Sequence, residues 1–409
     1  MEPLAGTHRA AEARIAVSGY YGFDNSGDEA VLESILLALR EEGERAGIRA
    51  VPVVLSADPA KTAALYGVEA AHRMRPGELI RTLRSCDALI SGGGSLLQDA
   101  TGLMTIPYYL GVIRLAQWLG KPAFVYAQGI GPVRRAAFRP LIRHVLGRCR
   151  YVSVRDGQSA ELLERFGLPA RPEVVPDPVM GFPNLKLADG AVQGTGGEVP
   201  DAADGAGAAK TGAPETGSGS GPEAAPPDTG MPAVGVSVRF WRRDRRELER
   251  IAEALTRLAE ERPVRLRLLP FHPPGDEEAS AYVMELLAPA ARGRAEIVRG
   301  ADTPLKMLRQ IAGCDLVIAM RLHALIYAAT QLVPMLAVSY DPKIDHFMNQ
   351  LGLSSSGTTD AIDPAALAGE ALRLLADSAA WRASHGPAIE EMRRNSRRPA
   401  QQIMAFLRK

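Results

Sequence analysis

Short runs rich in aliphatic and β-branched residues alternate with helical patterns along most of this 409-residue chain. Strands that alternate with helices form parallel sheets, because parallel neighbours need a crossover long enough to hold a helix. The runs expected to form strands are 14–18, 51–55, 88–90, 123–128, 151–154 and 173–175, followed by 233–238, 264–269, 296–298, 316–319 and 335–338. The pattern therefore predicts an α/β fold made of two units.

The longest interruption of this alternation is the segment 188–230, built mostly from Gly, Ala, Pro, Asp, Glu, Ser and Thr without any aromatic residue. Such a segment buries too little apolar surface to offset the backbone entropy lost on ordering, about 1–2 kcal/mol per residue. We therefore predict a disordered tether between two domains. The expected organisation is a flexible N-terminus at 1–13, an N-terminal domain at 14–187, the tether at 188–230, a C-terminal domain at 231–386, and a C-terminal helix at 387–409 that could pack back on the first domain.

Charge and cysteine content exclude several classes of protein. The 48 Lys and Arg residues balance 47 Asp and Glu residues, so the net charge of +1 provides no overall field for a nucleic-acid partner. Three widely separated cysteines and the absence of any His, Cys, Asp or Glu cluster with ligand spacing argue against a metal site. No apolar run approaches the roughly 20 residues that span a bilayer. The sequence predicts a cytoplasmic protein without nucleic acid, metal or cofactor.

A glycine-rich turn, GYYGFDNSGD at 19–28, joins the first expected strand to a helix. Ser26 and Glu29 have the spacing of a capping box, which predicts where this helix begins. Unpaired N–H groups at a helix start can bind an anion or a sugar oxygen, so Asn25 and Asp28 are candidate binding residues. The alternative is that both residues only cap the helix and form the turn.

A second glycine-rich loop, SGGGSLLQD at 91–99, follows another buried strand. Consecutive glycines lose much backbone entropy on folding, so they indicate either positive φ angles or the close approach of a ligand. Gly93 and Gly94 are therefore candidate binding positions, with a purely structural turn as the alternative.

Three cations and one histidine stand directly after expected strands: Arg155, Arg321, His323 and Lys343. An arginine between two apolar runs needs a partner because burying a lone charge is costly, and an anion is one such partner. Histidine can exchange protons near neutral pH, as a general acid or base must. The alternatives are a surface ion pair for Arg155 and a structural role for His323.

The chain resembles the polysaccharide pyruvyl transferase family, in particular its bacterial CsaB-like branch, in five segments that occur in the same order: GYYGFDNSGDEAVL, SGGGSLLQD, SVRD, AMRLHALIYA and YDPKIDHF. The resemblance implies a GT-B-like fold, in which two Rossmann-like α/β domains face a cleft. The long tether departs from the family pattern and leaves the spacing of the domains open.

The resemblance also implies a reaction. Phosphoenolpyruvate donates a pyruvyl group to a sugar as a ketal and phosphate is released; the acceptor is typically an N-acetylmannosamine unit of a lipid-linked cell-wall disaccharide, and the product anchors surface-layer proteins. A lipid-linked acceptor requires peripheral contact with the inner face of the membrane. The arginines between 134 and 150 are a candidate basic surface for that contact, with a solvated helix face as the simpler alternative.

Matched motif by motif, the resemblance implies roles for individual residues. The implied catalytic residues are His323, Arg155 and Lys343. The implied donor-binding residues are Arg321, Arg155, Leu322 and Lys343. The implied acceptor-binding residues are Asn25, Asp28, Gly93 and Gly94. The residue types leave open whether His323 begins as acid or base. A nucleotide-sugar glycosyltransferase of GT-B fold is the rival enzyme, and a non-catalytic protein that binds a sugar polymer is the rival of another class.

Overall fold

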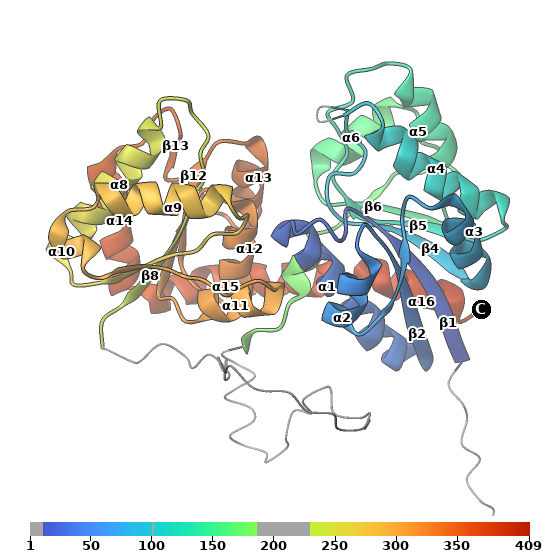
Figure 1. The fold of residues 1–409 in the computed structure, drawn as a ribbon, viewed down its shortest axis with the longest axis horizontal. Coiled ribbons are helices and arrows are strands. Elements are labelled where there is room, and N and C mark those ends of the chain that lie inside the picture. Colours follow the sequence, from blue (N-terminus) through green and yellow to red (C-terminus); the bar gives the residue numbers. More distant parts are fainter. Residues whose placement is uncertain (1–10, 100–101, 186–229) are drawn as a thin grey trace, which may run out of the picture.

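The computed structural model describes residues 11–99, 102–185 and 230–409, which form two α/β domains side by side (Figure 1). Residues 1–10 and nearly all of the predicted tether lie outside the described residues. Both sheets are parallel throughout, as the alternation of strands and helices predicted. No helix in the described ranges is long and apolar enough to cross a membrane.

Within the described part of the N-terminal domain, seven strands form a sheet in the order β3-β2-β1-β4-β5-β6-β7. The strands are β1 (Ala11–Ser18), β2 (Ile48–Ser56), β3 (Glu69–His72), β4 (Ala88–Gly92), β5 (Ala123–Gln128), β6 (Tyr151–Val154) and β7 (Glu173–Val174). The helices are α1 (Ser26–Ala46), α2 (Pro59–Tyr66), α3 (Pro76–Ser85), α4 (Thr105–Trp118), α5 (Phe138–Leu146), α6 (Gly157–Arg165) and the 3₁₀ helix η1 (Pro178–Gly181).

The C-terminal domain, counted over residues 230–409, has six strands in the order β10-β9-β8-β11-β12-β13. These strands are β8 (Ala233–Ser237), β9 (Arg265–Leu268), β10 (Ala295–Ile297), β11 (Leu316–Ala319), β12 (Met335–Ser339) and β13 (Gly357–Thr358). The helices that follow them are α8 (Arg246–Glu261), α9 (Gly275–Leu286), α10 (Pro289–Arg292), α11 (Pro304–Ala312), α12 (Leu322–Thr330), α13 (Pro342–Gln350), α14 (Pro364–Ala376), α15 (Ser378–Ser396) and α16 (Arg398–Leu407).

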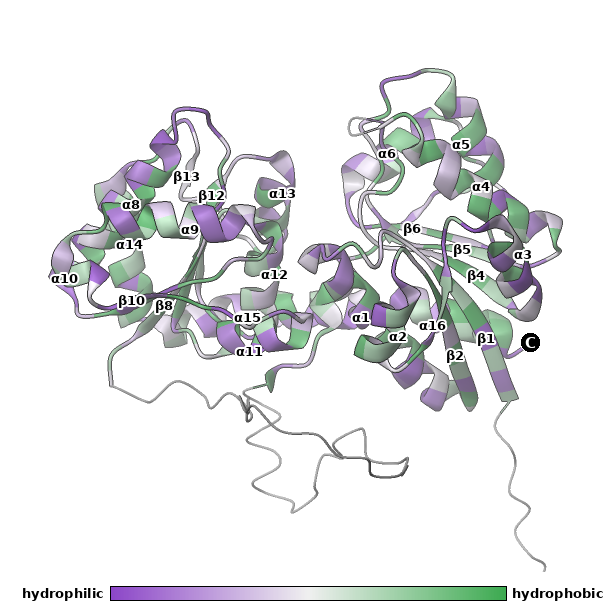
Figure 2. Cartoon of the chain, viewed as in Figure 1, coloured by the Kyte–Doolittle hydropathy of each residue, from purple (hydrophilic) through white to green (hydrophobic). Residues whose placement is uncertain are grey.

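The strand order places a topological switch point in each domain. In the first domain, β2 and β3 are added on one side of β1, and the strands from β4 onward are added on its other side. In the second domain the same change of side occurs between β8 and β11. Open α/β sheets bind ligands outside the carboxyl ends of strands at such points. Most residues of the central strands are coloured as hydrophobic in Figure 2, and β4, β5, β8, β11 and β12 are buried along their whole length. The loops at the strand ends are therefore the positions left for polar chemistry.

Three local features differ from the sequence-based expectations. Strand β1 begins at Ala11, three residues earlier than expected, because its first residues pair with β2 from Ile48 onward. Strands β3 and β13 were not predicted, since both are short and are defined by pairing with β2 and β12. The predicted capping box does not form.

Asn25 caps α1 in place of Ser26, and its Oδ1 accepts a hydrogen bond from the N–H of Gly27. Ser26 is the first helical residue and donates instead to the carbonyl of Phe271 in the other domain. Glu29 accepts from the N–H of Gly22, so it holds the glycine-rich turn rather than the helix start. A capping box is a local motif, and here contacts that are distant in sequence replace it.

Helices α15 and α16 lead the chain back to the first domain, where α16 packs on α1, β5 and β6 (Figure 1). Phe406 of α16 meets Phe124 of β5 edge to face, with ring centroids 5.4 Å apart. At the domain boundary, Tyr327 of α12 lies between Phe182, at 5.7 Å, and Phe271, at 5.5 Å. The apolar core is therefore continuous across the two domains, which fixes the geometry of the space between their strand ends.

Candidate functional site

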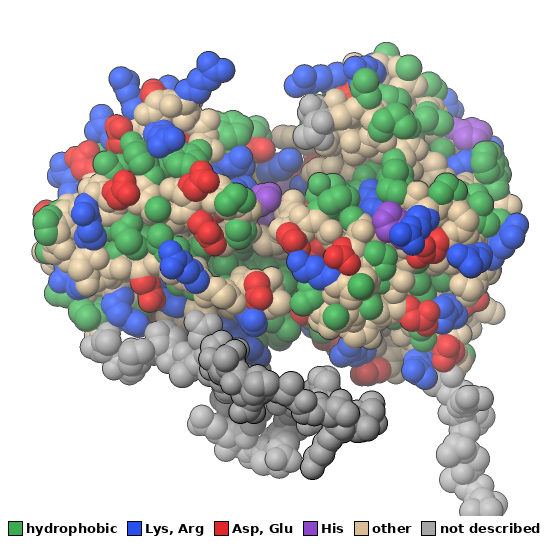
Figure 3. Space-filling model, viewed as in Figure 1, with side chains coloured by type: hydrophobic (Ala, Val, Ile, Leu, Met, Phe, Trp, Pro, Cys, Tyr) green, Lys and Arg blue, Asp and Glu red, His purple; other side chains and the backbone are tan. Residues whose placement is uncertain are grey.

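A cavity of about 320 Å³ opens between the carboxyl ends of the two sheets. It corresponds to the hollow between the two lobes in Figure 3. From the N-terminal domain it is lined by Ser95, Gly129, Ile130, Gly131, Pro132, Arg155, Asp156, Gln158, Ser159, Leu162, Arg165 and Asp177. From the C-terminal domain it is lined by Leu322, Ile326, Asp341, Pro342, Lys343, His346, Phe347 and Gln350. We call this space the main cavity.

Arg155 lies on the floor of the main cavity, at the end of β6. Its guanidinium forms an ion pair with Asp177, with Nη1 and Oδ2 3.1 Å apart, and donates through Nη2 to the hydroxyl of Ser95 at 2.9 Å. The side chains of Arg155 and Asp177 are only 10% and 8% exposed. A Cβ on Gly129 would lie 3.0 Å from the guanidinium, so the glycine makes room for it. The ion pair is thus buried beside the main cavity and is not the surface ion pair that was the alternative for Arg155.

His323 sits in the first turn of α12 and reaches across to the first turn of α1. A Cβ on Gly27 would lie 2.6 Å from both Cε1 and Nδ1 of the imidazole. The Nε2 atom is shielded from solvent and has no hydrogen-bond partner among the described residues. Burial lowers the pKa of His323, as do the charges of Arg155 and Arg321, while Asp177 raises it. The neutral imidazole is therefore favoured at neutral pH.

Asp28 lies one residue beyond Gly27, and its carboxyl group packs against the glycine-rich loop. A Cβ on Gly94 would lie 2.6 Å from Oδ1 of Asp28. Burial raises the pKa of Asp28 to about 7; Arg155 partly offsets this, whereas Glu29 and Asp177 add to it. A carboxyl group with this pKa is partly protonated at neutral pH, which makes it a candidate general acid.

The other three expected acceptor residues lie in the same part of the molecule as Asp28. Gly93 and Gly94 have φ angles of +48° and +71°, and a Cβ on Gly93 would lie 1.8 Å from a methyl carbon of Val31. Gly93 thus lets the loop pack closely on α1, whereas at Gly94 the neighbour is the end of the Asp28 side chain. Asn25 caps that helix. All four expected acceptor residues lie together at the start of α1, but none of them lines the main cavity.

Arg321 is the N-cap of α12, and its guanidinium points at an acid of its own domain. Nε donates to Oδ2 of Asp276 at 2.9 Å, and Nη2 donates to Oδ1. Neither Arg321 nor His323 lines the main cavity, although Leu322 between them does. An anion in the cavity would meet Arg321 only through guanidinium N–H groups that Asp276 does not use.

Lys343 borders the main cavity from the first turn of α13. Its Nζ lies 4.0 Å from Asp341, and the side chain is half exposed, so the ammonium group can turn toward a ligand. The structure therefore brings Arg155, Leu322 and Lys343 together on one cavity. His323 and Asp28 are not among the lining residues of this cavity, but the charges of Arg155 and Asp177 act on the pKa values of both.

A second cavity, of about 440 Å³, lies between the domains and is lined by groups of a different kind. Asp24, Glu29 and Asp302 surround it together with Lys61, Tyr66 and hydroxyl side chains, so acids predominate. Ser26 and Phe271, which are hydrogen-bonded to each other, both belong to its wall. An anionic ligand is therefore better suited to the main cavity than to this one.

Two acids of the site were missed by sequence reasoning. Asp177 follows an expected strand by two residues, so the rule that selected Arg155 would have selected it as well. Asp276 lies in the first turn of α9, seven residues after the expected strand 264–269, and an acid is ordinary at a helix start, so no local signal marks it. In the described ranges no group of three or more His, Cys, Asp or Glu side chains could hold a metal ion.

The arrangement combines cations for an anion with two groups that can carry protons, because burial raises the pKa of Asp28 and lowers that of His323. Arginine binds phosphate and carboxylate groups through paired N–H donors, and a lysine adds a point charge. An acid that keeps its proton and a histidine that has lost its proton, drawn from opposite domains, are what a proton-transfer reaction needs. The site is thus suited to chemistry on an anionic substrate with one proton donated and one removed.

A family model described as polysaccharide pyruvyl transferase matches residues 25–342. No curated protein matches the chain. Among solved structures, the UDP-GlcNAc 2-epimerase of Neisseria meningitidis bound to UDP-GlcNAc is 10% identical, with 97% of this chain and 99% of that chain covered and a TM-score of 0.57. A glycosyltransferase from Rickettsia africae is 12% identical, with 97% and 98% covered and a TM-score of 0.56. These likenesses extend over both domains and support the GT-B fold alone.

Proposed function

The chain belongs to the polysaccharide pyruvyl transferase family, and from this premise we propose that it transfers a pyruvyl group from phosphoenolpyruvate to a saccharide as a ketal. The observation that carries the proposal is the family match over 25–342, which includes the cations of the main cavity except Lys343. Phosphoenolpyruvate has a phosphate and a carboxylate group. Arg155 and Lys343 would bind these groups, and Leu322 would pack beside them.

Two residues would move protons in this reaction. Asp28, with its raised pKa, would protonate the methylene carbon of phosphoenolpyruvate and leave a cationic carbon that carries the phosphate. A sugar hydroxyl would attack that carbon and lose its proton to neutral His323. A second hydroxyl of the same sugar would then displace the phosphate and close the cyclic ketal, and its proton would leave with the phosphate. Proton return from His323 to Asp28 would restore the resting state.

Arg321 has a positioning role in this proposal. Its ion pair with Asp276 fixes the start of α12, from which His323 projects. Arg155 would have two roles, because it contacts the donor and, through its charge, holds the pKa of Asp28 lower than burial alone would. Asn25, Gly93 and Gly94 would shape the acceptor side by holding the start of α1.

The acceptor that the family resemblance suggests is an N-acetylmannosamine unit of a lipid-linked cell-wall disaccharide, whose pyruvylated polymer anchors surface-layer proteins. Such a substrate would bring the protein to the inner face of the membrane as a peripheral protein. The segment 134–150 supports this contact, because it holds six arginines and no acid. Gly131 and Pro132, which line the main cavity, lie next to this basic segment.

A nucleotide-sugar glycosyltransferase is the second candidate, because the solved structures that match include a glycosyltransferase. The released product separates the two functions. The decisive experiment incubates the full chain with phosphoenolpyruvate and a synthetic disaccharide diphosphate, then follows phosphate release and the mass of the sugar product. Phosphate release with a pyruvylated product supports the proposal. Release of a nucleoside diphosphate from a nucleotide sugar, with phosphoenolpyruvate unchanged, overturns it.

The role of His323 has its own test in the same assay. His323→Ala should abolish turnover while calorimetry still detects phosphoenolpyruvate binding, because the donor cations remain. His385→Ala is the matched control, since the His385 ring lies against Trp381, with ring centroids 5.1 Å apart, and lines neither cavity. Near-normal turnover by His323→Ala contradicts the assigned role.

A further inference from the structure

The loop between β8 and α8 concentrates positive charge at the carboxyl edge of the C-terminal sheet. Residues 239–246, RFWRRDRR, include five arginines and one aspartate, a net charge of +4. Because β8 is next to β11 in the sheet, this loop emerges at the same edge as Arg321. We call residues 239–246 the β8 loop.

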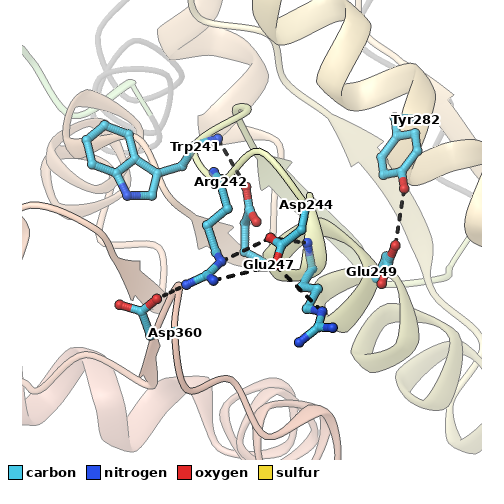
Figure 4. Close-up of polar contacts among 8 residues, drawn as sticks. Trp241, Arg242, Asp244, Glu247, Glu249, Tyr282 and Asp360 are labelled. Atoms are coloured by element: carbon cyan, nitrogen blue, oxygen red, sulfur yellow. Dashed lines mark hydrogen bonds and ion pairs between the residues drawn. The ribbon is translucent and has the colours of Figure 1, made fainter.

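The β8 loop is held in one conformation by acids at its base (Figure 4). The buried carboxylate of Glu247 accepts hydrogen bonds from the backbone N–H groups of Trp241 and Arg242, both at 3.0 Å. The guanidinium of Arg242 pairs with Asp244 at 3.0 Å and with Asp360. A loop pinned at successive residues presents its other side chains with little freedom to rearrange.

One aromatic surface is formed by Arg239, Trp241 and Tyr340, and we call it the Trp241 platform. The rings of Trp241 and Tyr340 have centroids 4.6 Å apart. The guanidinium of Arg239 lies 4.9 Å from the Tyr340 ring and 5.4 Å from the Trp241 ring, and donates to the Tyr340 hydroxyl at 3.0 Å. Trp241 nevertheless remains 51% exposed. The Trp241 ring thus contacts Tyr340 and Arg239 while about half of its surface remains accessible to solvent, so it can stack on a ligand.

The platform adjoins the lining of the main cavity along the chain. Tyr340 is followed directly by Asp341, Pro342 and Lys343, all of which line that cavity. The segment that follows Tyr340 thus belongs to the cavity lining, whereas Tyr340 and Trp241 themselves are not among the lining residues.

Charge around the platform points to an anionic ligand. Arg239, Arg243 and Arg245 have no carboxylate partner in the described part of the chain, whereas Arg242 and Arg246 share Asp244. Arg243 is exposed and follows Trp241 by two residues. An uncharged sugar would not need these guanidinium groups, and a bare phosphate would not need the ring.

We propose that the Trp241 platform binds a glycosyl diphosphate, with the sugar ring stacked on Trp241 and the diphosphate next to Arg243 and Arg239. The identity of this ligand as the acceptor rests on the proposed function. The same chemistry occurs in a lipid-linked saccharide and in a nucleotide sugar, and the test distinguishes the two sources.

The test measures binding by calorimetry without phosphoenolpyruvate, so that it does not depend on turnover. The probes are a disaccharide carrying a short water-soluble prenyl diphosphate, the same disaccharide without phosphate, and a UDP-N-acetylhexosamine. Trp241→Ala should weaken binding of the prenyl-linked probe at least tenfold, and Trp241→Phe should retain most of the affinity. Trp118→Ala is the matched control, because Trp118 is 71% exposed and also lies beside a guanidinium, that of Arg114 at 5.1 Å.

Arg243→Gln provides a second variant that leaves the packing of the rings unchanged. It should weaken the diphosphate probe several-fold and leave the phosphate-free disaccharide unaffected. Equal binding by wild type, Trp241→Ala and Arg243→Gln overturns the proposal, as does an equal loss in Trp118→Ala. If only the UDP sugar binds, and its binding depends on Trp241 in the same way, the platform is supported as a ligand site. That result would contradict the proposed pyruvyl transfer and favour a nucleotide sugar as the ligand. In turnover assays the platform variants should raise KM for the acceptor and leave KM for phosphoenolpyruvate unchanged.

Discussion

Arg321 and Asp276 form a two-pronged ion pair, in which Nε donates to Oδ2 at 2.9 Å and Nη2 donates to Oδ1. Asp276 is 1% exposed, and its Oδ2 also accepts the backbone N–H groups of His272 at 3.0 Å and Phe271 at 3.2 Å. The carbonyl of Phe271 in turn accepts from Ser26 of the other domain. Arg321 is thus connected through one buried acid to the contact between the domains.

Replacing Arg321 by Ala should lower the free energy of unfolding by about 3 kcal/mol, because it leaves the carboxylate of Asp276 buried and unpaired. Urea unfolding followed by circular dichroism measures the loss. The double variant Arg321→Ala with Asp276→Asn should recover part of it, since the amide oxygen still accepts from the backbone and carries no charge. Unchanged stability of Arg321→Ala would contradict the structural role, and reduced donor binding counts as a direct effect only in a folded variant.

This pair also illustrates what the sequence could and could not predict. The alternation of apolar runs predicted both parallel sheets, and polar residues directly after strands identified Arg155 and Lys343, because parallel strands end at one edge. Asp276 is 45 positions before Arg321 and follows no strand directly. Its pairing depends on how α9 packs, which local patterns do not contain.

The sequence could identify side chains that are able to carry protons, but it could not predict their protonation states. His323 could be named from its position after a strand. The pKa shifts of His323 and Asp28 arise from burial between elements that are far apart in sequence, the start of α1, the glycine-rich loop and α12. Acceptor binding by Asp28 stays a prediction, and its raised pKa is the basis of the additional proposal that it donates a proton.

Gly94→Ala and Gly67→Ala should separate backbone strain from damage to the site. Both glycines have left-handed φ angles, +71° and +62°, so each alanine should cost about 1 kcal/mol of stability. No atom lies within 4 Å of a Cβ at Gly67, whereas at Gly94 it would lie 2.6 Å from Oδ1 of Asp28. The carboxylate can move away from the methyl group, so stability should fall similarly in both variants. Activity should fall at least tenfold in Gly94→Ala only, and equal activities would show that the placement of Asp28 is unimportant.

Asp28→Asn should make the folded chain more stable at pH 8. Burial raises the pKa of Asp28 from 3.8 to about 7, so the folded chain keeps a proton that the unfolded chain releases. Stability therefore decreases as pH rises from about 4 to 7, by at most about 4 kcal/mol at about 1.4 kcal/mol per unit. Thermal unfolding should show a gain for Asp28→Asn at pH 8 and none at pH 3.5. Glu161→Gln, at an exposed position, is the control. If Asp28→Asn has wild-type stability at pH 8, the Asp28 carboxyl group does not have a raised pKa in the folded chain.

The pH dependence of kcat/KM for pyruvyl transfer should be bell-shaped. On the acid side activity should rise as His323 loses its proton, below the ordinary value of 6.5 because burial lowers its pKa. On the basic side it should fall above about pH 7 as Asp28 loses its proton. The pKa of the phosphate group of phosphoenolpyruvate is measured separately by phosphorus NMR, and the pH profile is corrected for the ionisation of that group. Activity that keeps rising beyond pH 8 would assign the acid role to another group.

The basic segment near the main cavity should bind anionic membranes. Arg134 and Arg135 are exposed; their backbone N–H groups donate to the carboxylate of Asp99 at 2.8 and 2.9 Å, while their guanidinium groups form no ion pair within 4 Å among the described residues. Each arginine close to an anionic surface contributes about 1 kcal/mol, so Arg134→Gln with Arg135→Gln should weaken binding to phosphatidylglycerol vesicles by about 30-fold in a sedimentation assay. Arg81→Gln with Arg84→Gln, on α3, removes the same charge from another exposed surface and should have little effect. The two double variants have the same net charge and differ only in where the charge is removed. Equal losses of vesicle binding in both would therefore mean that net charge, and not this segment, governs attachment.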